Sequence, residues 1–149
     1  MTVVNAPAML GIEELDIHLN DVILAIKGSL PDKAPGPDGV PADLFKYNID
    51  LWAPILENGF RAVSTSVLPP AWSSAIIVPI FKKGDHSDPA CYRPISLIDA
   101  TAKIFGRILL AHLEAWALDN NIISKSQFGF RNAVGTAEQC LNLHLIREK

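Results

Sequence analysis

Apolar residues recur at intervals of three and four along much of the chain, the spacing that gathers them on one side of a helix. From these segments we predict four helices: Gly11 to Ile26; about Ala42 to Val67, with breaks near Asp50 and Gly59; Ile98 to about Leu118; and a last one that Thr136 caps. The last pattern reaches Lys149 without a glycine, a proline or a polar cluster, so we expect the helix to continue beyond that residue.

Two short runs rich in β-branched residues, SAIIVPIF and CYRPISL, flank the turn formers of KKGDHSDPA. This order predicts a β-hairpin with a long tip. Pro79 and Pro94 have no N–H to donate to a sheet, which favours edge strands or bulged strands. Ser96-Leu97-Ile98-Asp99 resembles a capping box at the start of the third helix. The fold class that follows is α+β, with helices around a β-hairpin.

Three cations, Lys82, Lys83 and Arg93, lie beside the predicted tip. If the tip is centred near Ser87-Asp88, Lys82 falls opposite Arg93 and Lys83 opposite Tyr92. Like charges opposite one another destabilise a sheet by about 0.2–1 kcal/mol, so an anion between them would favour this arrangement. A guanidinium fork and a mobile ammonium can together follow a phosphate chain, as in a nucleotide triphosphate or a nucleic-acid backbone.

The same cations also have ordinary explanations. Lysines at a hairpin tip commonly protect a sheet edge, and Asp85 and Asp88 are close enough in sequence to neutralise them. Arg93 could instead form an ion pair with Asp99 or Asp85. The residues alone leave these alternatives open.

A stretch dense in prolines and glycines, SLPDKAPGPDGVP, separates the first two predicted helices. Within it Pro37-Asp38-Gly39 predicts a turn, because proline fixes φ and glycine accepts the positive φ that follows. A plain surface turn and a binding loop are both compatible with this segment.

The composition, with 49% hydrophobic residues over 149 positions, is sufficient for one domain with a core. The net charge of −3 argues against a general polyanion binder, although the residues after Val78 carry nine Lys and Arg against seven Asp and Glu. Cys91 and Cys140 form neither a CxxC pair nor a disulfide framework, and the four histidines lack metal-ligand spacing. The cysteine pattern fits a reduced, intracellular setting. No apolar stretch is long enough to span a membrane, so we expect no membrane partner.

Three stretches carry a resemblance to a known family. They are KAPGPDGVPADLFK, LPPAWSSAIIVPIFKKGDHSDPACYRPISLIDATAKIFGRIL and SQFGFR. In this order and at this spacing they resemble the N-terminal part of the reverse transcriptase of non-LTR (LINE-type) retrotransposons. The resemblance covers roughly Leu30 to Ile146 and matches the first predicted helix only weakly.

The resemblance implies a partial fingers and palm of a right-hand polymerase fold. Residues 1–29 would be an N-terminal helical extension, and residues 30–149 the N-terminal, fingers part of the reverse transcriptase domain, ending before the catalytic palm. The implied partners are an RNA template, a DNA primer, a deoxynucleotide triphosphate and the remainder of the polymerase polypeptide. The complete family enzyme uses two Mg²⁺ ions held by aspartates in D…AFD-like and ADD-like blocks. Neither block occurs here, so we expect no cofactor and no catalytic residue in this chain.

The resemblance also assigns candidate binding residues. Lys82 or Lys83, together with Arg93, would contact the triphosphate of the incoming nucleotide. The expected template contacts are Pro35, Gly36, Pro37, Asp38 and Gly39, followed by Gln127, Gly129 and Arg131. In the first group, the Gly-Pro turn would let the backbone approach a nucleic-acid strand closely.

A second hypothesis comes from a different class of protein. Without the palm aspartates, the chain could be a non-catalytic remnant or an adopted module that binds protein or nucleic acid. Such a module would associate through apolar surface that a palm would otherwise cover.

Overall fold

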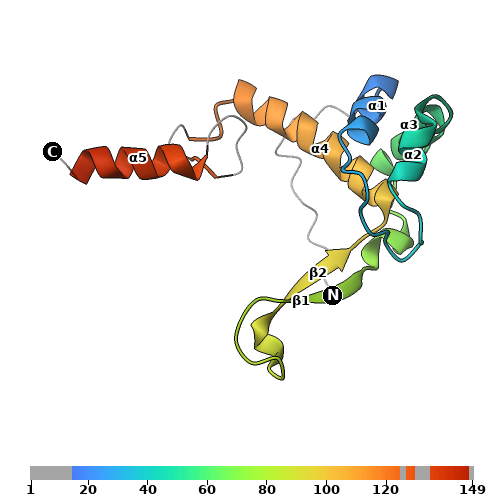
Figure 1. Ribbon diagram of the computed structural model, residues 1–149. Helices are drawn as coiled ribbons and strands as arrows, with labels where there is room; N and C mark the ends of the chain where they lie inside the picture. The colour runs from blue at the N-terminus through green and yellow to red at the C-terminus, as the bar shows by residue number, and fades with distance from the viewer. Residues whose placement is uncertain (1–14, 125–126, 130–134, 148–149) are drawn as a thin grey trace, which may run out of the picture. The chain divides into compact units, whose positions relative to one another are not determined.

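The computed structural model describes residues 15–124, 127–129 and 135–147. In chain order its elements are α1 (Leu19–Lys27), α2 (Asp43–Tyr47), α3 (Ile49–Ser64), the 3-10 turn η1 (Pro70–Ser73), β1 (Ile76–Phe81), the 3-10 turn η2 (Pro89–Cys91), β2 (Tyr92–Leu97), α4 (Ala100–Asp119) and α5 (Thr136–Arg147) (Figure 1). This mixture of helices with one two-stranded antiparallel hairpin agrees with the predicted α+β class. No helix in the described ranges is both long and apolar enough to cross a membrane.

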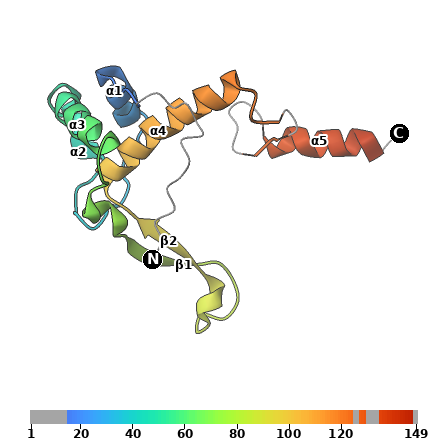
Figure 2. The ribbon, with the colours of Figure 1, turned by 180° about the vertical axis from the view of Figure 1, so that it is seen from behind.

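The chain forms two compact units, Met1–Leu109 and Leu110–Lys149, and the boundary falls inside α4. In the first unit, α1, α2 and α3 pack on one another, and they also lie together when seen from behind in Figure 2. The second unit contains the C-terminal half of α4 and α5.

The core of the first unit collects apolar side chains from α1 and the residues just before it, from α2 and α3, and from the N-terminal half of α4. Its buried members are Ile17, Val22, Ala25, Ile26, Phe45, Ala53, Phe60, Ala100, Ile104, Phe105 and Ile108. Phe60, Trp72 and Phe105 form an aromatic cluster in which each ring contacts the other two, with centroid separations of 5.3, 5.4 and 6.2 Å. Such aromatic contacts add stabilisation beyond the apolar area that they bury.

The first helix begins later than its apolar pattern predicts. α1 starts at Leu19, and the part of the prediction before residue 15 lies outside the described residues. The backbone N–H of His18 donates to the carboxylate of Asp21 over 2.9 Å, which satisfies a donor at the helix start.

The second predicted helix divides at Asn48, close to the break predicted near Asp50, whereas the break predicted near Gly59 is wrong. The Asn48 side chain accepts from the Leu51 N–H at 3.3 Å and so caps α3. Gly59 continues the helix, because the roughly 1 kcal/mol that a glycine costs a helix is smaller than the gain from burying the neighbouring Phe60.

The capping box predicted at Ser96 to Asp99 is also wrong. Ser96 belongs to β2, where it pairs with Ile77, and α4 begins only after Asp99. Pairing with β1 therefore extends the strand through the residue that the local pattern assigned to the helix start.

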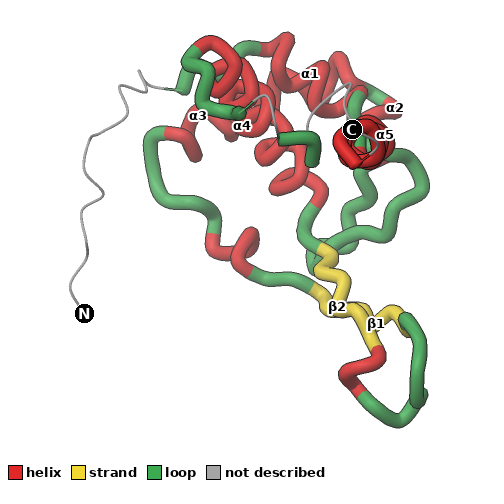
Figure 3. Tube along the Cα trace, turned by 90° about the vertical axis from the view of Figure 1, so that its left-hand side faces the viewer, coloured by secondary structure: helices red, strands yellow, loops and turns green. Residues whose placement is uncertain are grey.

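The hairpin, with its strands yellow in Figure 3, differs from the predicted register by two residues. Arg93 lies opposite Ile80, and Tyr92 opposite Phe81. The pairing continues one step further, because the Lys82 N–H donates to the Cys91 carbonyl over 2.9 Å. The tip is therefore centred at His86-Ser87, one residue earlier than assumed, and η2 winds Pro89–Cys91 into a turn on its β2 side.

Both strands are edges of the two-stranded sheet, as their prolines predict. Pro79 lies directly opposite Pro94. Since the Lys82–Cys91 pair is hydrogen bonded and bonded pairs alternate in an antiparallel ladder, Pro79–Pro94 is a non-bonded pair. The two missing N–H groups therefore face the outer edges, where they leave the ladder intact and discourage a third strand.

Candidate functional site

The three cations of the hairpin are exposed, and within the described ranges none of them forms an ion pair. Arg93 opposes Ile80, which is two positions before Lys82, so Arg93 and Lys82 share a face of the hairpin as diagonal neighbours. Such neighbours are about 7–8 Å apart, a distance that two long side chains can close around one phosphate group. The assumed register with Lys82 directly opposite Arg93 is wrong, although the two side chains still lie on one face of the hairpin.

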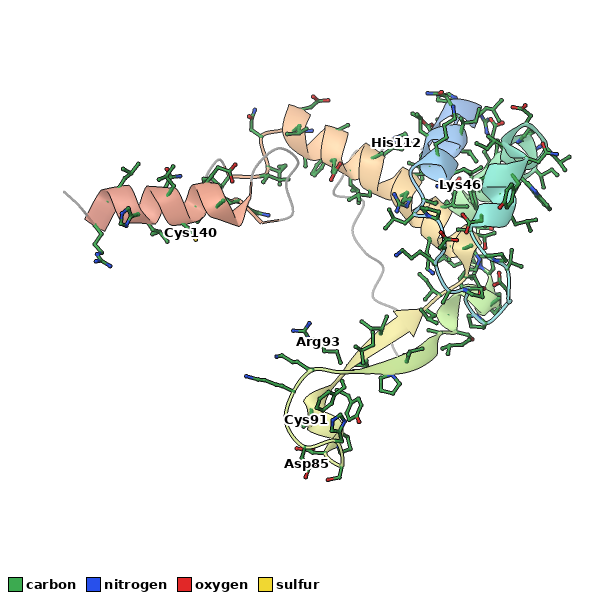
Figure 4. The ribbon with its side chains drawn as sticks, in the orientation of Figure 1. Lys46, Asp85, Cys91, Arg93, His112 and Cys140 are labelled. Atoms are coloured by element: carbon green, nitrogen blue, oxygen red, sulfur yellow. The ribbon has the colours of Figure 1, made fainter. Side chains whose placement is uncertain are left out.

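The carboxylates near the cations bond to the backbone instead. Asp85 accepts from the Ser87 N–H at 2.8 Å, and this bond, aided by the Ser87 side chain, holds the pKa of Asp85 below its ordinary value. Asp88 accepts from the Ala90 N–H at 2.9 Å. In Figure 4, Arg93 projects away from Asp85. The acids therefore shape the tip and, among the described residues, do not neutralise the cations.

Asp99, the other ion-pair partner considered for Arg93, is buried and bonds to a different residue. Its side chain is 4% exposed, and its Oδ1 accepts from the backbone N–H of Asp38 at 3.2 Å. The alternative in which Arg93 pairs with Asp99 is therefore not what the structure adopts.

The opposite face of the hairpin carries aromatic rings that the sequence patterns did not single out. Phe81 stacks on His86 with centroids 3.8 Å apart, and the Tyr92 hydroxyl donates to the His86 carbonyl at 3.0 Å. An open pocket of about 510 Å³ lies on this face, lined by Pro79, His86, Ser87, Pro89, Tyr92 and Pro94. The only signal in the sequence is the placement of Phe81 and Tyr92 at the two ends of the tip.

The loop of the first template motif forms the predicted turn, in which the Gly39 N–H donates to the Gly36 carbonyl at 3.1 Å. Gly39 has φ +70°, the conformation for which glycine was expected. Gly36, however, is buried, and a Cβ there would lie 2.4 Å from the backbone nitrogen of Asp99. The backbone of Gly36 therefore packs closely against another part of this chain and not against a ligand. Pro37, Asp38 and Gly39 are exposed.

The second template motif belongs to the other compact unit. Gln127 and Gly129 are exposed, and the Gln127 side-chain amide donates to the Gly129 carbonyl at 3.4 Å. Arg131 lies outside the described residues.

Comparison with known proteins gives a consistent set of relatives, although no family model matches the chain. It is 29% identical over 147 residues to the "Probable RNA-directed DNA polymerase from transposon BS" of Drosophila melanogaster, covering 95% of this chain and 16% of that protein. It is 37% identical over 109 residues to the "RNA-directed DNA polymerase from mobile element jockey" of the same organism, covering 72% of this chain and 12% of that protein.

A third relative is the "Retrovirus-related Pol polyprotein from type-1 retrotransposable element R1" of Bradysia coprophila. It is 28% identical over 138 residues, covering 87% of this chain and 13% of that protein. The chain thus spans about one sixth or less of the length of these relatives. All three come from non-LTR elements, which confirms the resemblance found in the motifs. The chain belongs to the RNA-directed DNA polymerase (reverse transcriptase) family of non-LTR retrotransposons.

Proposed function

We propose that this chain supplies contacts to the RNA template and to the incoming deoxynucleotide triphosphate within a retrotransposon polymerase. The observation that carries the proposal is the exposed cationic face of the hairpin, where Arg93 and Lys82 are diagonal neighbours without ion-pair partners among the described residues. Lys83 adds a third exposed charge at the same tip. Phosphate oxygens are the natural ligands for such a group.

The proposal extends to the architecture and the partners. Residues 30–149 would be the N-terminal, fingers part of the polymerase domain in a right-hand fold, and residues 1–29 a helical extension. The remaining polypeptide and a DNA primer would complete the working site. The exposed turn residues Pro37, Asp38 and Gly39 would contact the template. Gln127, Gly129 and Arg131 are proposed, separately, as further template contacts.

The chemistry of nucleotide addition is assigned to other parts of the polymerase. Mg²⁺ supplies Lewis-acid and orienting functions in this kind of phosphoryl transfer. Among the residues that the structure describes, no cluster of three or more His, Cys, Asp or Glu could hold the ion. The role proposed for the side chains of this chain is to bind and orient phosphate groups.

Binding of single-stranded RNA tests the proposal. If three cations neutralise three phosphates, the logarithm of the association constant should fall with the logarithm of salt with a slope of about −2, roughly a 20-fold loss between 50 and 200 mM. Arg93→Ala should weaken binding and reduce the slope by about 0.7. In this chain by itself, a deoxynucleotide triphosphate should compete with the RNA for the hairpin cations, because both offer them phosphate oxygens. Fluorescence anisotropy across a salt series measures all three effects.

The matched control is Arg61→Ala, which removes an exposed arginine on α3 that pairs with Glu57 and Asp16. It should leave RNA binding unchanged, since that guanidinium is not on the hairpin. Binding that ignores salt, or that Arg61→Ala weakens as much as Arg93→Ala, would contradict the proposal.

A second candidate function, a protein-binding module, is favoured by the aliphatic residues of the hairpin. Ile76, Val78 and Ile80 lie on one face with Ile95, and each is at least 39% exposed. Sedimentation at rising protein concentration should then show self-association that Val78→Ser reduces, because that change removes apolar area from the centre of the face. A monodisperse monomer at high concentration would count against this candidate.

A further inference from the structure

Asp99 occupies the junction between the hairpin and α4. β2 ends at Leu97, α4 begins at Ala100, and the Asp99 carbonyl accepts from the Lys103 N–H at 3.1 Å. The residue thus has the position of a helix N-cap, which alone is an ordinary reason for an aspartate. Its carboxylate, however, is buried and bonded to a residue 61 positions earlier in the chain.

That distant partner is the backbone of the 35–39 loop. The Asp38 N–H donates to Asp99 Oδ1 at 3.2 Å, and the buried Gly36 fits against the backbone of Ile98 and Asp99. The Asp38 carboxylate accepts from the Val40 N–H at 2.9 Å, which closes the turn on its own side. The loop is therefore fastened by a hydrogen bond and a close backbone contact to the two residues that follow β2.

We propose that Asp99 is a positioning residue that holds the 35–39 loop in fixed register with the cationic hairpin. The proposal rests on the proposed function, because the loop and the hairpin carry the two sets of ligand contacts assigned there. A carboxylate that accepts from a backbone N–H forms a charge-assisted hydrogen bond, which is stronger than a neutral one. Removing the acceptor leaves the Asp38 N–H without this bond and frees the loop to move relative to the hairpin.

Three substitutions separate positioning from helix capping. Asp99→Ala removes both the acceptor and the cap. Asp99→Ser keeps a good N-cap residue but is one bond too short to reach Asp38. Asp99→Asn keeps an acceptor oxygen at the same distance from the backbone.

Amide hydrogen exchange in the chain of 149 residues measures directly how well the loop is held in place. Exchange at the Asp38 amide should become about tenfold faster or more in Asp99→Ser and Asp99→Ala, and rise much less in Asp99→Asn, which keeps a neutral acceptor. Amides in α3 should keep their protection, which shows that the core remains folded. The positioning role would be overturned if the exchange rate of the Asp38 amide did not change in Asp99→Ser. It would also be overturned if exchange became faster by the same factor at Asp38 and in α3.

RNA binding, measured where the helical circular dichroism of each variant equals that of the parent, then tests the coupling. Asp99→Ser should weaken binding about fivefold or more, and Asp99→Asn should restore it. Suppose that the loop loosens in Asp99→Ser without any loss of RNA affinity, while Arg93→Ala still weakens RNA binding. That result overturns the coupling between loop position and RNA binding and leaves the proposed function intact. If Arg93→Ala has no effect, the proposed function fails, while the exchange result still decides whether Asp99 holds the loop.

Discussion

Replacing Phe60 with alanine is expected to lower the free energy of unfolding by about 4 kcal/mol, the typical loss for a buried phenylalanine. Phe60 is 2% exposed and contacts the rings of both Trp72 and Phe105. Truncation leaves a cavity between α3 and α4 and removes two of the three ring contacts in the aromatic cluster. Urea denaturation followed by circular dichroism measures the change.

Tyr47→Ala is the matched control, because it also truncates an aromatic side chain in the first unit. Tyr47 is 90% exposed, so its loss should change the unfolding free energy by no more than about 0.5 kcal/mol. Phe60→Leu should fall between the two, since it retains much of the buried volume. A loss below about 1 kcal/mol for Phe60→Ala would show that the aromatic cluster is not a core.

The hairpin was predictable because its signals are local. β-Branched runs, turn formers and the two prolines lie within about twenty residues of one another, and the strands form where those signals place them. The register was not predictable, because it depends on how the tip winds. The Asp85 and Asp88 side chains shape that tip by accepting from the Ser87 and Ala90 N–H groups, and Pro89–Cys91 forms a 3-10 turn within it.

The apolar face of α4 shows what helical periodicity does not predict about burial. Helical spacing places Leu113 and Trp116 on the same apolar face as Phe105, but the buried residues are Ala100, Ile104, Phe105 and Ile108. Leu113 is 54% exposed. Helical spacing gives the angular position of a side chain but does not reveal how far along the helix a neighbour covers it. Only the half of α4 in the first compact unit contributes to the described core.

The candidate site also has one part that the sequence predicted and one part that it did not. The cations of the hairpin were found from the sequence because charge and turn chemistry are visible there. The role of Gly36 was not, because its neighbour Asp99 is far away in sequence and only the fold brings the two backbones together. Gly36 was therefore predicted to let a nucleic-acid strand approach the backbone. In the structure, the backbone of Ile98 and Asp99 occupies the space that a side chain at Gly36 would need.

Gly36→Ala should accordingly be among the most damaging single-methyl additions in the chain. The added Cβ would lie 2.4 Å from the Asp99 nitrogen and the Ile98 carbonyl carbon, and neither backbone atom can rotate away as a side chain could. The loop must separate from the start of α4, with an expected loss of about 3 kcal/mol in unfolding free energy. The same shift breaks the bond from the Asp38 N–H to Asp99, so faster exchange at that amide should accompany the lost stability.

Two other glycines show whether this loss comes from packing or from the methyl group itself. Gly39→Ala meets no atom within 4 Å but must adopt φ +70°, so it should cost only about 1 kcal/mol. Gly59→Ala meets nothing within 4 Å in the interior of α3 and should stabilise the chain by about 0.5–1 kcal/mol. Urea denaturation of the three variants should rank them in this order, with Gly36→Ala the least stable. If Gly36→Ala were as stable as the parent, the loop would not be seated against α4, and the positioning role of Asp99 would fail with it.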